Sequence, residues 1–130
     1  MKTLLEIKNL AVTFEFNGQK VNAVKDSSFK INKGECLAIV GESGSGKSVT
    51  ALTIMRLIRS NSNLKISGSA NYEKKNLLNL DEFNLQKIRG KKISMIFQEP
   101  MTSLNPLHNI EKQITECFLL NQKSNKSKCI

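Results

Sequence analysis

Eight consecutive residues combine types and spacing suited to holding a polyphosphate: Gly41-Glu42-Ser43-Gly44-Ser45-Gly46-Lys47-Ser48. They fit the phosphate-loop (P-loop) pattern G-x-x-x-x-G-K-[ST] without a mismatch. Glycines lack a Cβ, so such a loop can adopt positive φ angles and bring its N–H groups close to phosphate oxygens. Lys47 offers a point charge to the β- and γ-phosphates, and the Ser48 hydroxyl suits Mg²⁺, which prefers oxygen ligands. The motif therefore predicts a site for a nucleoside triphosphate and Mg²⁺.

Two other kinds of segment share the glycine-rich character of the motif. A flexible Gly/Ser linker would need neither the Lys-Ser pair nor structured flanks. A dinucleotide-binding fingerprint would need a third glycine at the position that Val49 occupies. The phosphate loop is the interpretation that fits all eight residues.

The flanks of the loop predict the elements that must position it. The apolar run Cys36–Val40 reads as a strand with Cys36 buried, and Val49–Ile58 reads as a helix. The N-terminus of such a helix adds free N–H groups, that of Val49 among them, and the positive end of the helix dipole.

The rest of the chain predicts a mixture of strands and short helices. The expected strands cover 4–10, 12–16 (a second strand or the continuation of the first), 21–31 and 93–97. A hairpin turn is expected at Asn17-Gly18, and short strands around a turn at Gly68 are expected within 64–72. The expected helices run from Asp81 to Ile88, ended by Gly90, and onward from a cap at Asn109. From Asn121 on, the chain is a polar, lysine-rich tail.

Composition excludes several classes of protein. The 130 residues are 39% hydrophobic and 24% charged, which suits one small globular domain. No apolar run approaches the ~20 residues that span a bilayer, and Glu6 interrupts the only segment that could be a signal peptide, so a cytoplasmic location is expected. The net charge of +9 is spread along the chain without a basic-aromatic platform, so no nucleic-acid partner is expected.

A second motif, Met95 to Pro106 (MIFQEPMTSLNP), follows the phosphate loop. Together with Glu42–Leu52, it resembles the ATP-binding subunits of ABC transporters, in the oligopeptide/dipeptide importer branch. Residues 93–113 are most similar to importers with two nucleotide-binding domains in one chain, the type that also takes up microcin C. The resemblance covers about residues 4–120.

The resemblance implies an α/β fold. It would be a partial P-loop NTPase (RecA-like) core with an N-terminal antiparallel β-subdomain, followed by the start of a helical subdomain. Residues 1–98 would form the first part of the ATP-binding core, and 99–130 would begin the helical subdomain.

The resemblance also implies roles for residues outside the phosphate loop. Gln98 matches the glutamine that reaches Mg²⁺ and the attacking water. Phe14 matches the aromatic residue that stacks on adenine, with Phe16 as the competing choice. The segment 99–106, with Met101 and Leu104, matches the surface that faces the membrane permease. His108 does not match the family's switch histidine and is expected at the surface.

The chain departs from the family pattern in three respects. It contains no signature motif and no switch histidine, and the only imitation of a Walker B strand, Leu77–Glu82, carries the amide Asn79 where a buried strand needs an apolar residue. That segment is therefore expected to start a helix. The chain is expected to be the N-terminal half of one nucleotide-binding domain, with weak Mg·ATP binding at best and no measurable turnover by itself.

The expected function is ATP-driven peptide import at the inner face of the plasma membrane, together with permease subunits and a second nucleotide-binding domain. A non-catalytic remnant or interaction module is the alternative. A different P-loop enzyme, such as a small kinase, would need a cluster of lid arginines that Arg56, Arg59 and Arg89 do not form.

Overall fold

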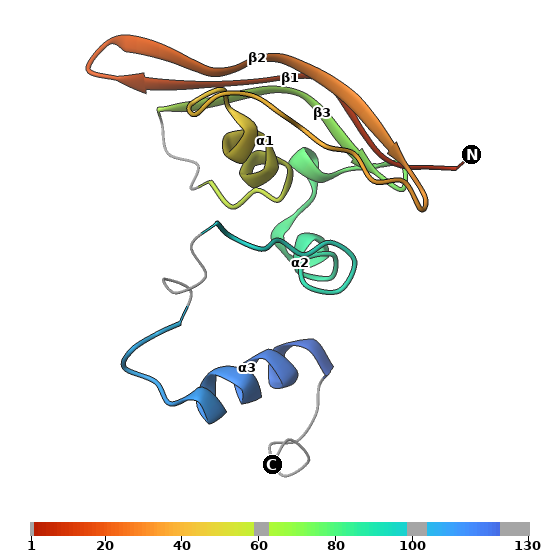
Figure 1. Ribbon diagram of the computed structural model, residues 1–130, viewed down its shortest axis with the longest axis vertical. Helices are drawn as coiled ribbons and strands as arrows, with labels where there is room; N and C mark the ends of the chain where they lie inside the picture. Colours follow the sequence, from red (N-terminus) through yellow and green to blue (C-terminus); the bar gives the residue numbers. More distant parts are fainter. Residues whose placement is uncertain (1, 59–62, 99–103, 123–130) are drawn as a thin grey trace. The chain divides into compact units, whose positions relative to one another are not determined.

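The computed structural model describes residues 2–58, 63–98 and 104–122, with side chains to residue 119 (Figure 1). The chain forms two compact units, Met1–Asp81 and Glu82–Ile130, each described by itself. The boundary expected after residue 98, between the ATP-binding core and the helical subdomain, stays a prediction. Among the described residues, no helix is long and apolar enough to cross a bilayer.

The first unit is built on an antiparallel sheet (Figure 1). Its strands are β1 (Thr3–Phe16), β2 (Gln19–Asn32), β3 (Leu64–Tyr72) and β4 (Lys75–Asn76), in the order β2-β1-β3-β4. Asn17 and Gly18 have φ angles of 49° and 77°, as a tight hairpin turn requires, so the turn predicted between β1 and β2 is confirmed. Of the two alternatives predicted for 12–16, continuation of the first strand is the one that forms: 4–10 and 12–16 lie in the single strand β1, with register shifts between Ile7 and Thr13.

Gly68 interrupts the pairing of β1 with β3 without reversing the chain. It has a φ of 90°, and the register between the two strands shifts between Lys8 and Ala11. The carbonyl groups of Lys8 and Asn9 lie where a Cβ on Gly68 would stand. The predicted turn at Gly68 was therefore wrong: the glycine permits an irregularity inside a single strand.

The core of the first unit lies between the sheet and the helix α1 (Lys47–Ile54), with the short 3₁₀ helix η1 (Leu77–Asn79) beside them. Its most buried apolar side chains come from β1, β3 and η1: Ile7, Leu10, Val12, Ala70 and Leu77. α1 is shorter than the predicted 49–58. It begins two residues earlier and ends at Ile54, and Arg56, with a φ of 49°, has left the helical conformation. Arg59 is outside the described residues.

Two predicted strands do not form. Residues 36–40 and 94–97 are not β-strands, and Ile93 forms only an isolated β-bridge with Arg89. A strand exists only where a neighbouring backbone pairs with it, and among the described residues the sheet consists of β1–β4 alone. Cys36, expected to be buried, is exposed, as are Val40 (89%) and Ile96 (93%).

The segment that imitates a Walker B strand is not a strand. Leu77–Asn79 is 3₁₀-helical, and its N-cap Asn76 accepts a hydrogen bond from the N–H of Leu78 at 3.2 Å. The helix α2 (Glu82–Gln86) then begins one residue after Asp81. The predicted helix start is confirmed, although α2 ends at Gln86, before the predicted Ile88. The N–H of Ile88 donates to the carbonyl of Leu85, three residues back, as in a 3₁₀ turn.

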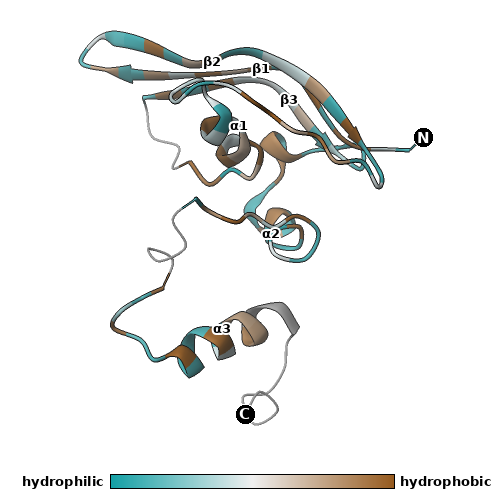
Figure 2. Ribbon diagram, viewed as in Figure 1, coloured by the Kyte–Doolittle hydropathy of each residue, from teal (hydrophilic) through white to brown (hydrophobic). Residues whose placement is uncertain are grey.

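The second unit contains α2 and the helix α3 (Ile110–Gln122). The predicted cap is confirmed: the Asn109 Oδ1 atom accepts a hydrogen bond from the Lys112 N–H at 2.9 Å. Figure 2 shows hydrophobic and hydrophilic residues alternating along α3. The half-buried His108 lies with its Nε2 atom 3.1 Å from the Lys112 Nζ atom. The tail beyond Gln122 is outside the described residues.

Candidate nucleotide site

The phosphate loop owes its course to two glycines in the left-handed region. Gly44 has a φ of 80° and Gly46 a φ of 89°. Gly44 lies in open space, whereas Gly46 is buried and its α-carbon faces the Ala23 carbonyl of β2, where a Cβ would clash. Gly46 is also the N-cap of α1, and a glycine has no side chain to cap the helix. The N–H groups of the first turn of α1 are therefore left to other acceptors.

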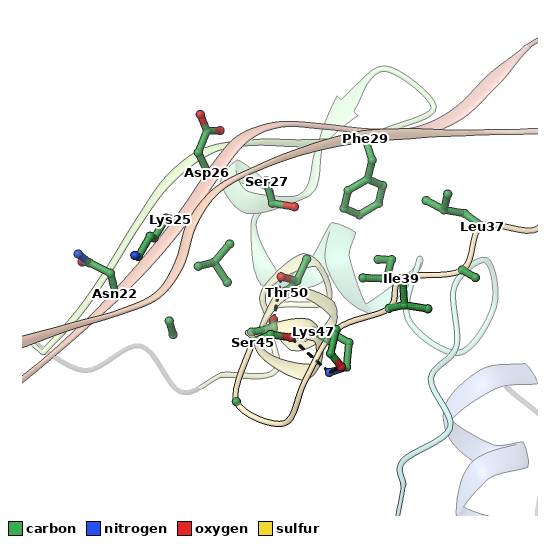
Figure 3. Close-up of a pocket in the computed structure, with 17 residues that line it drawn as sticks. Asn22, Lys25, Asp26, Ser27, Phe29, Leu37, Ile39, Ser45, Lys47 and Thr50 are labelled. Carbon is green, nitrogen blue, oxygen red and sulfur yellow. Dashed lines mark hydrogen bonds between the residues drawn. The ribbon is translucent and has the colours of Figure 1, made fainter.

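Lys47 closes the loop on itself. Its Nζ atom donates to the carbonyl oxygens of Gly41 at 2.6 Å and Glu42 at 2.7 Å, and to the Ser45 Oγ atom at 3.3 Å. Figure 3 shows the bond to Ser45. The ammonium group is thus held against the loop by residues that precede α1, while Lys47 itself is the first residue of α1. No acidic residue occupies the first turn of α1, so nothing in that turn offsets the positive end of the helix dipole. The arrangement is suited to an anion.

The other residues of the loop and of the first turn of α1 differ in their exposure. Glu42, Ser43 and Ser48 are exposed, and Val49 is half-buried in the first turn of α1. Ser48 immediately follows Lys47, so an exposed hydroxyl stands next to the ammonium-bearing residue. Mg²⁺ in nucleotide sites takes one or two protein oxygens and completes its shell with phosphate and water. The exposed hydroxyl of Ser48 fits that requirement.

A cavity of about 720 Å³ lies between β2 and the chain that runs from Leu37 into α1 (Figure 3). The loop and first turns of α1 form one wall with Gly44, Ser45, Gly46, Lys47 and Thr50, and β2 forms the other from Asn22 to Ser27. Phe29, Leu37 and Ile39 give it an apolar end. A volume of this size matches a small-molecule site.

Sequence reasoning missed the β2 wall and Thr50. The motif specifies the loop, but no local pattern indicates that Ala23 would pack against Gly46. Thr50 is 6% exposed, and its Oγ1 atom donates to the Gly46 carbonyl at 2.9 Å. Its position four residues after Gly46 was the one available signal, because that spacing lets a threonine in a helix bond backward.

Phe14 lies on β1 and is half-buried. Its ring stacks on that of Phe16, with centroids 6.2 Å apart and planes at 17°. Neither Phe14 nor Phe16 belongs to the described residues that line the cavity beside the phosphate loop. A role for Phe14 in stacking on adenine stays a prediction.

Gln98 is exposed, and it belongs to the second unit, whereas the phosphate loop belongs to the first. Its role at Mg²⁺ and water stays a prediction. The expected permease-facing segment is only partly described: residues 99–103, Met101 among them, lie outside the described residues, and Leu104 is 50% exposed.

Comparison with known proteins gives consistent matches. Residues 24–129 match the ABC transporter family. The oligopeptide transport ATP-binding protein OppD of Bacillus subtilis (strain 168) is 50% identical over 123 residues, which cover 95% of this chain and 34% of OppD. The dipeptide transport ATP-binding protein DppD of Lactococcus lactis subsp. cremoris (strain MG1363) is 51% identical over 120 residues, covering 92% of this chain and 34% of DppD.

The chain thus spans about a third of the length of these curated relatives. Among solved structures, the dimeric MJ0796, a bacterial ABC transporter cassette, superposes with a TM-score of 0.76 at 26% identity, covering 94% of this chain and 50% of that one. The predicted α/β fold of a partial ATPase domain and the predicted resemblance to oligopeptide and dipeptide transport ATP-binding proteins are confirmed. The chain belongs to the ABC transporter family.

Proposed function

We propose that this chain is the nucleotide-binding part of an ABC importer that couples ATP binding and hydrolysis to peptide uptake. The observation that carries the proposal is the ammonium group of Lys47, held at the uncapped N-terminus of α1 beside a cavity of about 720 Å³. Peptide as the cargo is supported by the names of the relatives, which are oligopeptide and dipeptide transport ATP-binding proteins.

In this proposal, residues of the loop and two residues outside it have separate roles. The N–H groups from Gly44 to Val49 bind phosphate oxygens, with Lys47 neutralising the β- and γ-phosphates. Ser48 holds Mg²⁺, which when bound draws charge from the phosphates. Gln98 positions the attacking water, and Phe14 stacks on adenine. The binding of phosphate by the loop is the step for which the structure offers most support.

Hydrolysis requires more than these residues supply. Phosphoryl transfer needs carboxylates that hold the metal and orient water, and we propose that a second nucleotide-binding domain and further family motifs complete the site. The segment 99–106 would contact the permease, at the cytoplasmic face of the inner membrane. The chain by itself would bind Mg·ATP weakly and turn it over at a negligible rate.

Calorimetric titration of the chain with Mg·ATP tests the proposal. A hydrogen bond to a charged group contributes roughly 1.5–3 kcal/mol, so Lys47→Ala is expected to weaken binding at least ~10-fold. Lys8→Ala is the matched control, because Lys8 is an exposed lysine of the same unit that pairs with Glu6 at 3.0 Å. Equal affinities of the two variants, or no binding by the wild type, would favour a non-catalytic remnant.

A further inference from the structure

The carbonyl group of Gly46 is held by one residue through two hydrogen bonds. The N–H of Thr50 donates to it at 2.8 Å, and the Thr50 Oγ1 atom donates at 2.9 Å. The first bond belongs to any α-helix that starts here, whereas the second depends on a hydroxyl side chain at position 50. Thr50 is 6% exposed, so water competes little for either bond.

The other side of Gly46 is fixed by β2. The Ala23 carbonyl lies against the Gly46 α-carbon, and the Val24 Cγ2 atom lies 3.3 Å from the place of a Cβ. Gly46 keeps a φ of 89° between these neighbours. The direction of the next residue, Lys47, and of the first N–H groups of α1 follows from the orientation of Gly46.

We infer that Thr50 is a positioning residue for the phosphate loop, acting through the Gly46 carbonyl. The inference rests on the proposed function, since the phosphate of Mg·ATP is what the loop would be positioned to receive. The Thr50 hydroxyl points at the loop from the cavity wall (Figure 3). Its proton is engaged by Gly46, so Thr50 acts by holding Gly46 and leaves the phosphate to the loop amides and Lys47.

The same helix supplies a matched control. Thr53 is fully buried, and its Oγ1 atom donates to the Val49 carbonyl at 2.7 Å. This is the same kind of bond as that of Thr50, made by the same residue type about one turn farther from the loop. Bonds of this kind contribute little to the stability of the helix itself. The two threonines therefore differ chiefly in the carbonyl that they bind: that of Gly46, at the start of α1, for Thr50, and that of Val49, within α1, for Thr53.

The first test is calorimetric titration with Mg·AMP-PNP, a non-hydrolysable ATP analogue, on four forms of the chain. Loss of one neutral hydrogen bond corresponds to a change of about threefold to tenfold, so Thr50→Val is expected to weaken binding by that factor. Thr50→Ser, which keeps the hydroxyl, and Thr53→Val are expected to stay within about twofold of the wild type. Urea unfolding of each variant separates a loss of affinity from a loss of folding.

The second test needs no nucleotide. The amide of residue 50 exchanges with solvent only when its bond to Gly46 opens, so its exchange rate reports how firmly Gly46 is held. We expect Thr50→Val to raise this rate at least about threefold after correction for the intrinsic side-chain effect, and Thr53→Val to leave it unchanged. The inference is overturned if Thr50→Val and Thr53→Val give the same exchange rate at residue 50, or if the wild type binds Mg·AMP-PNP and the two variants bind it equally well.

The two tests also separate this inference from the proposed function. A wild-type chain that fails to bind Mg·AMP-PNP would count against the proposed function. The exchange rates at residue 50 would still decide whether Thr50 holds Gly46.

Discussion

The backbone carbonyl of Ala23 on β2 lies against the α-carbon of Gly46 in the phosphate loop, with no room between them for a side chain. The first hairpin and the loop are therefore packed backbone to backbone. A sheet that is remote in sequence thus fixes the start of α1.

Gly46→Ala is expected to lower the free energy of unfolding by about 3 kcal/mol or more, since it combines positive-φ strain with a clash against backbone. Gly44→Ala is the control, because Gly44 has a similar φ of 80° but nothing within 4 Å of its added Cβ. It should cost only about 1–2 kcal/mol. Urea denaturation measures both, and equal costs would show that Ala23 can move away.

Mg²⁺ is expected to increase the affinity of the chain for ATP, and Ser48→Ala is expected to make this increase about tenfold smaller. The reason is that the exposed residue Ser48 carries the hydroxyl proposed as the ligand of the metal. Affinity for ATP in excess EDTA should be unchanged. Titrations with and without Mg²⁺ measure the difference, and Ser43→Ala, at another exposed loop serine, is the control. A Mg²⁺ effect that survives in Ser48→Ala would exclude this serine as the ligand.

Gly68→Ala is expected to destabilise the first unit by about 3 kcal/mol, because a Cβ there would meet the carbonyls of Lys8 and Asn9 on β1. Gly18→Ala in the hairpin turn shares the positive φ, at 77°, but meets nothing within 4 Å. Its expected cost is about 1 kcal/mol. Thermal unfolding followed by circular dichroism compares the two, and the prediction is wrong if Gly18→Ala is the more harmful.

Asn109→Ala is expected to remove about 1 kcal/mol of stability from the first turn of α3, since the Lys112 N–H loses its acceptor. Asn109→Asp should keep the cap and the helix. Hydrogen exchange at the amide of Lys112 reports the change locally, with a rise of about fivefold expected for the alanine variant alone. Equal exchange in both variants would mean that the cap contributes nothing.

Tyr72 connects stability to alkaline pH. Burial, with a further contribution from the negative charge of Glu73, raises the pKa of Tyr72 above its ordinary value of 10.0. At pH values below 10.0 the phenol is protonated in both the folded and the unfolded chain, so its contribution to the free energy of unfolding is fully present. As pH rises past 10.0, the unfolded chain ionises first, so stability falls until the folded phenol also titrates.

The Tyr72→Phe variant should lack this part of the decline. Urea titrations between about pH 8 and pH 11 compare the two chains. The sequence contains a single tyrosine, so no other phenol contributes. Parallel pH curves for the two proteins would contradict the assignment.

The parts of the fold that follow from local signals were predictable from the sequence. The Asn17-Gly18 turn, the cap at Asn109 and the loop ending at Ser48 each depend on residue types within a few positions of one another. The strand predicted at 36–40 depends instead on a partner that pairs with it, which its own residues do not specify.

The same distinction applies within the site. The motif identified the residues of the loop, but the wall of β2 and the hydroxyl of Thr50 were missed because they act across the fold. Gly68 was misinterpreted for a related reason: a positive-φ glycine suits both a turn and a bulge, and only the pairing of β1 with β3 decides between them.

The contacts of Lys47 bear on the energetics of any ligand of the loop. An ammonium group has three protons, and here they face two carbonyl oxygens and one hydroxyl of the loop itself. An incoming oxyanion must exchange places with at least one of these acceptors, so part of the enthalpy of the new bond is cancelled by the bond that it replaces. Discrimination among ligands should accordingly depend on how many oxygens each can present to the ammonium group at once.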